Sequence, residues 1–429
     1  MTRKRKRQAK GERSAKRGTH SRVPDPETVP VIAPEHFAPG TLGVAVFGPG
    51  KGEAIVVRLP DKRIGVVDGC REPRSGNHHG HGDPVRELLA AFAEYGGDPV
   101  AAQRLAFVCL THPHDDHYAG LGRMMDAYSG RIERLWMPPD SARYQKDLLT
   151  YLDKTRDDTT NLLDAGELKG LARVIEQQDQ LIDLPDVEFH IARAGVRAMR
   201  EFGKRRCCGR ELEITMCSPT DRDIHFASRH LTESIKNVLN GLRGTHYPNP
   251  DPNVISASLL IRWGKAKVLL AGDLLSGTNK YGGWGEAGKL INGPVQVVNV
   301  AHHASSGAHD AELWARMKPK LAIVTPYRRA KENNPPRPEM VRQLLESGAK
   351  VVITSPPDWP SDELQGFEWS RPLDDSGSGN AVPMKNCAIS ATKASGYSDR
   401  NNAVAVSLNS DGSIGRLVLG GQARMVRLP

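Results

Sequence analysis

The sequence concentrates metal-binding side chains in one short segment, His112-Pro113-His114-Asp115-Asp116-His117. Neutral imidazole and carboxylate groups hold Zn²⁺ or Mn²⁺ while leaving coordination positions for water. In an extended segment, a spacing of two lets His112 and His114 point to the same side. Asp116 and His117 stand where the chain turns, so they can reach a second ion. The segment therefore predicts a metal-binding loop that serves two divalent ions.

Two later apolar runs also lead into metal-binding residues. Residues 266–271 are followed by Asp273, and residues 295–300 are followed by the pair His302-His303. Ligands placed after strands gather at one edge of a layered αβ fold, where such proteins build their sites. We therefore expect these side chains to join the loop at residues 112–117.

Two further polar groups have weaker signals. Ser305 and Ser306 could present hydroxyls or amides to a phosphate, although a serine-rich turn after a strand is an equally good interpretation. His78-His79-Gly80-His81 has no flanking strand, and its neighbours indicate a flexible loop near the site. No Ser-His-Asp arrangement and no glycine-rich phosphate loop competes with the metal hypothesis.

The elements that must position these residues follow from hydrophobic patterns and turn residues. A short run that ends in Asp68-Gly69 places another carboxylate at the end of a strand. Helices are expected at residues 84–95 and 311–317 and in a segment opened by Pro338. Strands are expected at residues 42–47, 54–59, 64–67, 105–110, 212–217, 254–263, 266–271, 295–300, 321–325, 350–354, 403–408 and 415–419. The fold class is therefore α/β.

The chain of 429 residues divides into three parts in this interpretation. Residues 1–39 form a basic disordered arm with a proline-rich lead-in, and residues 40–356 form the main domain. Within that domain, residues 141–206 are expected to be a helical insertion. Residues 357–429 are expected to be a linker followed by a C-terminal β-hairpin extension.

The positive charge is concentrated at the N-terminus. Residues 1–18 hold nine Lys and Arg against Glu12, which accounts for +8 of the formal net charge of +9. The arm is thus a possible contact for nucleic acid, and a solvated tail is the alternative. An aromatic content of 5% argues against a channel that stacks bases.

The sequence indicates a cytoplasmic protein without membrane contact and identifies no protein partner. The N-terminus lacks an apolar signal segment, and no window approaches the ~18 apolar residues of a membrane span. Six cysteines without a Cys-x-x-Cys motif suit a reducing compartment.

The order of the motifs resembles the metallo-β-lactamase superfamily and, within it, the hydrolase domain of bacterial competence DNA-uptake (ComEC-like) proteins. The resemblance spans roughly residues 40–356. It is carried by Gly52-Glu53-Ala54, Val66-Val67-Asp68-Gly69, the loop at residues 112–117, Cys217-Ser218-Pro219, residues 256–260, Leu269-Leu270-Ala271-Gly272-Asp273, His302-His303-Ala304-Ser305, the helix with Pro338, and residues 348–353.

The resemblance implies an αββα sandwich that binds two divalent metal ions, Zn or Mn. It also implies that Asp68 orients a ligand histidine. The implied metal ligands are His112 and His114 for the first ion, Asp116 and His117 for the second, Asp273 between the two, and His302 or His303 for the second ion.

The sequence departs from the superfamily pattern in two places. The superfamily often has a further histidine before the Gly-Asp strand, and none of His190, His225, His230 and His246 lies in a recognisable motif. The family's His-His-Gly-Ser is His-His-Ala-Ser here, which adds a methyl group at Ala304.

The implied activity is hydrolysis by a hydroxide that bridges the two metal ions. Asp116 takes part as a ligand, and whichever of His302 and His303 is not a ligand donates a hydrogen bond or a proton to the developing charge. A phosphodiesterase or nuclease is favoured by the ComEC-like motifs and the basic arm. Two alternatives remain open: a hydrolase of small esters, thioesters or lactones, and a non-catalytic or partner-dependent interaction module.

Overall fold

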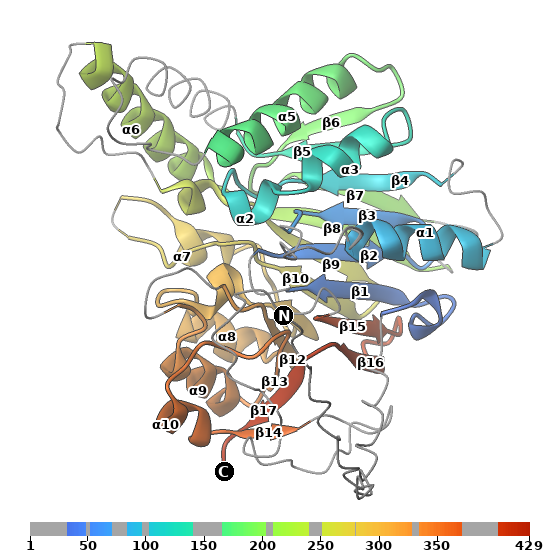
Figure 1. Ribbon diagram of the computed structural model, residues 1–429, viewed down its shortest axis with the longest axis vertical. Helices are drawn as coiled ribbons and strands as arrows, with labels where there is room; N and C mark the ends of the chain where they lie inside the picture. The colour runs from blue at the N-terminus through green and yellow to red at the C-terminus, as the bar shows by residue number, and fades with distance from the viewer. Residues whose placement is uncertain are drawn as a thin grey trace, which may run out of the picture.

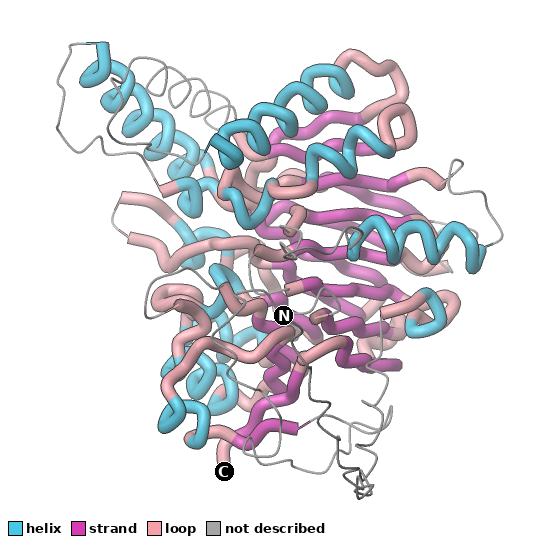
Figure 2. Tube along the Cα trace, in the orientation of Figure 1, coloured by secondary structure: helices cyan, strands magenta, loops and turns pink. Residues whose placement is uncertain are grey.

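In the computed structural model of the chain, strands run through the middle of the molecule and helices lie to either side of them (Figures 1 and 2). The structure describes residues 32–48, 52–70, 84–96, 103–139, 165–202, 209–239, 251–278, 280–327, 334–370 and 402–429. Most of the basic arm, the histidines at 78–81, residues 141–164 and the linker at 374–379 lie outside the described residues.

The first sheet combines the N-terminal strands with the C-terminal hairpin. Its strand order is β16-β15-β1-β2-β3-β4-β5-β6. Strands β3 to β6 are parallel to one another, whereas β15, β1, β2 and β3 pair in antiparallel fashion. The strands are β1 (Leu42–Phe47), β2 (Ala54–Arg58), β3 (Ile64–Val67), β4 (Leu105–Cys109), β5 (Arg134–Met137), β6 (Glu188–Ile191), β15 (Ala403–Leu408) and β16 (Ile414–Gly420).

The second sheet has the order β14-β17-β13-β12-β11-β10-β9-β8-β7. Its central strands β10 to β13 are parallel, so their carboxyl ends meet at one edge. The strands are β7 (Arg197–Phe202), β8 (Glu211–Ser218), β9 (Ser258–Trp263), β10 (Ala266–Leu270), β11 (Val297–Asn299), β12 (Leu321–Val324), β13 (Lys350–Ile353), β14 (Glu368–Ser370) and β17 (Arg424–Arg427).

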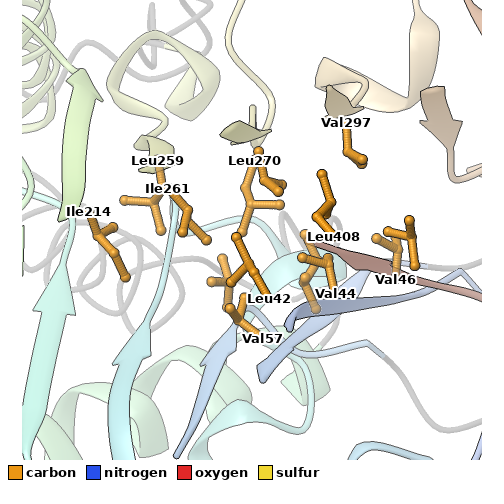
Figure 3. Packing of buried hydrophobic residues seen from close by; sticks show 14 of the residues in the cluster. Leu42, Val44, Val46, Val57, Ile214, Leu259, Ile261, Leu270, Val297 and Leu408 are labelled. Atoms are coloured by element: carbon orange, nitrogen blue, oxygen red, sulfur yellow. The ribbon is translucent and has the colours of Figure 1, made fainter. Parts of the chain in front are cut away.

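Side chains alternate between two buried faces along each strand, because successive residues of a strand point to opposite sides of the sheet. In β1, Leu42 and Val44 belong to the core between the sheets, and Ala45 belongs to the core under the helices. In β9, Ile261 faces the first core and Leu260 faces the helices of the second sheet. Figure 3 shows side chains from the two sheets pointing toward one another.

Helices cover the outer face of each sheet, which gives the αββα sandwich that was expected. Buried side chains of α1 (Pro84–Gly96), α3 (Leu121–Ala127) and α5 (Ala165–Ile182) pack against the first sheet. The second sheet is covered by α7 (Gly283–Ala287), α8 (Ala311–Met317), α9 (Pro338–Glu346) and α10 (Ser361–Gln365). Helix α6 (Asp221–Leu239) projects from the body beside these layers (Figure 1).

The prediction that residues 141–206 form a helical insertion is wrong for the part that follows helix α5. Residues 188–191 and 197–202 form β6 and β7, one at the edge of each sheet. Strand β6 alternates polar and apolar side chains over only four residues, all of them half-exposed or exposed, and so short a run at a sheet edge carries little sequence signal. Helix α5 packs on α3 and α2 (Asp115–Tyr118) and belongs to the outer layer of the first sheet.

The C-terminal segment is more than an added hairpin. The expected hairpin is present as β15 and β16, but β15 pairs with β1 along its full length. Strand β17, which was not expected, pairs with β13 in the other sheet. The last residues of the chain therefore complete both sheets.

One local difference concerns the segment that leads into β9. Residues 252–255 form a short 3-10 helix, η3 (Pro252–Ile255), where the beginning of a strand was expected. The strand of this region, β9, begins at Ser258.

Among the residues that the structure describes, no helix has the length and apolar character that a membrane-spanning segment needs.

Candidate metal centre

The predicted metal-binding residues come together where strands of the two sheets end. Asp68 follows β3 and His112 follows β4, whose pairing is parallel, so both lie at the same edge of the first sheet. Asp273 follows β10, and His303 follows β11, which pairs with β10 in parallel. The packing of the sheets thus brings together residues that are far apart in the sequence.

A first cluster consists of His112, His114 and Asp273, whose nitrogen and oxygen atoms lie within 4.8 Å of one another. His112 Nε2 is 3.1 Å from His114 Nδ1 and 3.7 Å from Asp273 Oδ2. The side chains of His112 and Asp273 are almost completely buried, and His114 is half-buried. The cluster could hold one divalent ion.

A second cluster consists of Asp116, His117, Asp273 and His303, all of them buried. His117 Nε2 is 3.2 Å from Asp273 Oδ1, and His303 Nε2 is 3.1 Å from Asp116 Oδ2. Asp273 therefore belongs to both clusters. The sequence left the choice between His302 and His303 open, and the geometry places His303 in the cluster.

His302 points to a different place from its neighbour. Its Nε2 lies 3.2 Å from Asn253 Nδ2, its Nδ1 lies 2.6 Å from Ser305 Oγ, and its side chain is 28% exposed. The backbone of His302, His303 and Ala304 is left-handed, with φ of 48°, 54° and 58°. Such values are uncommon for residues other than glycine. This turn separates the two adjacent histidines.

Three histidines are oriented through their Nδ1 atoms. Asp68 accepts a hydrogen bond from His117 Nδ1 at 2.7 Å, as well as hydrogen bonds from the amide and hydroxyl of Thr111. His112 Nδ1 lies 3.0 Å from the Thr111 hydroxyl, and His303 Nδ1 lies 2.9 Å from the carbonyl oxygen of Thr325. Each contact leaves Nε2 directed into the centre, an arrangement that fixes the tautomer of a ligand histidine.

A buried residue behind the second cluster was not predicted as part of the site. Glu53 Oε2 accepts hydrogen bonds from Asn299 Nδ2 at 3.1 Å and from Thr325 Oγ1 at 2.7 Å. Its backbone N–H donates to the carbonyl oxygen of Asp116 at 3.1 Å. The only sequence signal for this residue was its place in the Gly52-Glu53-Ala54 motif. Burial raises the pKa of Glu53.

The charges in the centre depend on one another. Burial lowers the pKa of His303, but the carboxylates of Asp273 and Asp116 outweigh it and raise this pKa to about 9. The same carboxylates raise the pKa of His117 well above its ordinary value against the effect of burial. For His112, burial and the charge of His117 lower the pKa well below the usual range. The centre therefore combines anionic and basic groups in a volume from which water is nearly excluded.

The donor atoms fit divalent metal ions. His117 Nε2 and Asp273 Oδ1 are buried, and neither completes a hydrogen bond with any residue that the structure describes, although they face each other. A buried polar atom without a hydrogen bond is costly, and a bound ion would remove that cost for both atoms. Imidazole and carboxylate are the usual protein ligands of Zn²⁺ and also suit Mn²⁺.

A pocket of about 280 Å³ opens over the two clusters and is lined by His114, Asp116, Asp273, His302 and His303. Of the two predicted serines, Ser305 lines this pocket, whereas Ser306 is exposed and does not. The remaining lining residues are Asp115, Tyr327, Asn334, Pro335 and Arg337.

The other histidines considered for the first ion do not reach the centre within the described residues. His190 lies 2.7 Å from Glu188 on β6, and His230 packs on Phe226 of α6. His225 is exposed on the same helix, and His246 lies outside the described residues. The first cluster therefore has three protein groups.

Two solved structures are among those similar to the chain. The chain is similar to Igni18, a metallo hydrolase from the archaeon Ignicoccus hospitalis, with 14% identity, coverage of 72% of this chain and 94% of that one, and a TM-score of 0.35. It is also similar to YhfI, a metallo-beta-lactamase fold protein from Bacillus subtilis, with 13% identity, coverage of 73% and 96%, and a TM-score of 0.35. No curated protein matches the chain significantly.

The family assignment rests on a sequence match. The family model of the Metallo-beta-lactamase superfamily matches residues 99–326, which is more than half of the chain. The match contains the loop at residues 112–117, Asp273 and His303. The chain therefore belongs to the Metallo-beta-lactamase superfamily and has the metal-dependent hydrolase fold of that superfamily around a candidate metal centre.

Proposed function

We propose that this protein is a phosphodiesterase or nuclease that uses two divalent ions, Zn or Mn. The observation that carries the proposal is the sharing of Asp273 between two clusters at the floor of one pocket. Two divalent ions, when bound, would supply an activated water and stabilise the attacking and leaving oxygens of a displacement at phosphorus.

The residues of the chain have separate tasks in this proposal. His112 and His114 would hold one ion, Asp116, His117 and His303 would hold the other, and Asp273 belongs to both clusters. Asp68 keeps His117 in the tautomer that presents Nε2.

The part of the centre that faces the substrate is formed by His302 and Ser305. His302 is partly exposed in the pocket, and its Nε2 would exchange the contact with Asn253 for a hydrogen bond to a substrate oxygen on which charge develops. Ser305 holds the ring of His302 through Nδ1, which fixes its direction. We therefore assign His302 to substrate stabilisation.

Two features of the sequence support phosphodiesters over neutral esters. The motif order resembles the ComEC-like hydrolase domain, and the basic residues of the arm would attract a polyanion. The proposal predicts that the chain belongs to the ComEC-like subfamily and that the N-terminal arm contacts nucleic acid.

The first experiment determines metal content and substrate class together. Purified protein is analysed for bound metals, and DNA, RNA, bis-p-nitrophenyl phosphate and a lactone are then tested in parallel with Zn²⁺ and Mn²⁺. We expect turnover of at least one phosphodiester. Turnover of the lactone alone would replace the proposal with a small-molecule esterase or lactonase.

A second experiment separates catalysis from a structural role of the metal. We expect His114→Ala and Asp116→Ala to abolish turnover while the circular dichroism spectrum stays that of the unaltered protein. Joint loss of activity and folded structure would mean that the metal is structural, and the protein would then fit a binding module better.

A further inference from the structure

Arg337 lies on the wall of the pocket that faces the metal clusters. It directly precedes α9, and its backbone N–H donates to the carbonyl oxygen of Ala304 at 3.0 Å. This hydrogen bond ties Arg337 to the left-handed turn that contains His302 and His303. Arg337 and His302 therefore line the same small pocket.

The guanidinium of Arg337 has no partner among the residues that the structure describes. It forms no hydrogen bond or ion pair there, and it does not cap α9. Arg342, within α9, contrasts with it, since its guanidinium donates to Glu363 at 2.9 Å and lies over the ring of Phe367. Arg337 therefore has no structural role comparable to that of Arg342.

The carboxylates of the pocket do not explain this arginine. Asp115, Asp116 and Asp273 line the pocket, and none of the three forms an ion pair with Arg337. Two divalent ions would bring more positive charge than these three aspartates neutralise. With ions bound, the pocket would be cationic, and Arg337 would add to this charge.

We propose that Arg337 binds non-bridging oxygens of the substrate phosphate and makes the pocket selective for phosphodiesters over neutral esters. The inference rests on the proposed function. A guanidinium offers a planar fork of donors that matches two phosphate oxygens, which an ammonium group does not. The pocket volume of about 280 Å³ lies at the small end of ligand sites, so it suits one phosphate group and its nearest atoms.

The test compares Arg337→Gln and Arg337→Lys with the matched control Arg342→Gln, which removes the same charge five residues further along, within α9. All variants are made in the full-length, metal-loaded protein, and metal content and melting temperature are measured for each. Activity is measured on bis-p-nitrophenyl phosphate and on the neutral ester p-nitrophenyl acetate. Affinity for inorganic phosphate is measured by calorimetry.

We expect Arg337→Gln to lower kcat/KM for the phosphodiester and the affinity for phosphate by about tenfold to a hundredfold, the range for a hydrogen bond to a charged group. Ester hydrolysis and metal content should stay unchanged. Arg337→Lys should restore part of the loss, and Arg342→Gln should behave like the unaltered protein.

Two results would overturn the inference: unchanged phosphate affinity in Arg337→Gln, or an equal loss of activity on both substrates. A failure of the proposed function looks different, because the unaltered protein would then hydrolyse no phosphodiester. The phosphate titration still decides the role of Arg337 in that case.

Discussion

Asp273 and Asp68 show how single carboxylates organise the centre. Asp273 presents one oxygen toward each cluster: Oδ2 lies 3.7 Å from His112 Nε2, and Oδ1 lies 3.2 Å from His117 Nε2. Asp68 accepts a hydrogen bond from His117 Nδ1 and acts on the centre through that histidine. These two residues therefore have roles that can be separated by experiment.

Asp68→Asn should weaken Zn²⁺ binding about 10–100-fold, the effect usual for the partner of a ligand histidine. The amide keeps the shape of the side chain but no longer accepts with both oxygens from Thr111 and His117. Competition with a chromophoric chelator measures the affinity, and Asp126→Asn, at an exposed carboxylate, is the control. Equal affinities in both variants would contradict the role of Asp68.

Metal affinity should increase with pH. In the metal-free protein, the pKa of His303 is about 9 and that of His117 is also raised, so both imidazoles hold protons at neutral pH. The ion needs them neutral, and binding must therefore release protons. Calorimetry at about pH 6.5 and about pH 8.5, in buffers of different ionisation enthalpy, should show tighter Zn²⁺ binding and less proton release at the higher pH. A pH-independent affinity would argue against these two ligands.

At the scale of elements, the loop between β1 and β2 supports the metal loop from behind. Gly52 has a φ of +93°, and a β-carbon at this position would collide with the carbonyl oxygen of Asp116. The next residue, Glu53, donates its backbone N–H to that same oxygen. The position of Asp116 thus depends on a glycine in the hairpin formed by β1 and β2.

Gly52→Ala should destabilise the protein by about 2–5 kcal/mol, because left-handed strain and steric overlap add. It should also lower activity through displacement of Asp116. Gly130→Ala is the matched control: its φ is +73°, but a β-carbon there would meet no atom within 4 Å. The control should cost only the strain, about 1–2 kcal/mol, without loss of specific activity. Thermal unfolding and metal-loaded assays measure both effects, and equal costs would contradict the contact with Asp116.

At the scale of the whole molecule, the two ends of the described chain are joined in the sheets. Strand β15 pairs with β1 from Leu42 opposite Leu408 to Phe47 opposite Ala403. Residues Val404, Val406 and Leu408 lie in the core between the sheets. The C-terminal strands are therefore part of the domain that holds the metal centre.

Ending the chain at residue 401 should prevent stable folding. The truncation removes β15, β16 and β17 and leaves the apolar side chains of β1 without their neighbours. Each buried aliphatic side chain lost from a core costs about 2–5 kcal/mol, so a few exceed the stability of a typical domain. Circular dichroism and solubility measure the outcome. A soluble, folded and active truncated protein would show that these strands are dispensable.

Removal of residues 1–20 should leave the fold and the hydrolysis of small phosphodiesters unchanged. It should weaken binding to nucleic acid and flatten the salt dependence, because most of the excess positive charge lies in this segment. Binding is compared for both proteins at about 50 and about 200 mM salt, where phosphate contacts lose most affinity. Equal DNA affinity would remove the arm from the proposed function.

The sequence alone determined the ligand types and the layers. Strong apolar runs such as residues 105–109 and 266–270 predicted strands correctly, since hydrophobic periodicity is a local property. The density of histidine and aspartate after these strands predicted a metal loop. Short, exposed edge strands such as β6 carry only four residues of this local signal, and their sheet pairing became visible only in the structure.

The tertiary structure alone decided which of two adjacent histidines enters the centre. His302 and His303 are the same in type, and only the left-handed turn at residues 302–304 separates their directions. Glu53 and Arg337 lie in segments that the resemblance includes without giving either residue a role, and they reach the site because the hairpin loop and the start of α9 pack against it. Such long-range contacts depend on the packing of whole elements, which residue types and spacing do not specify.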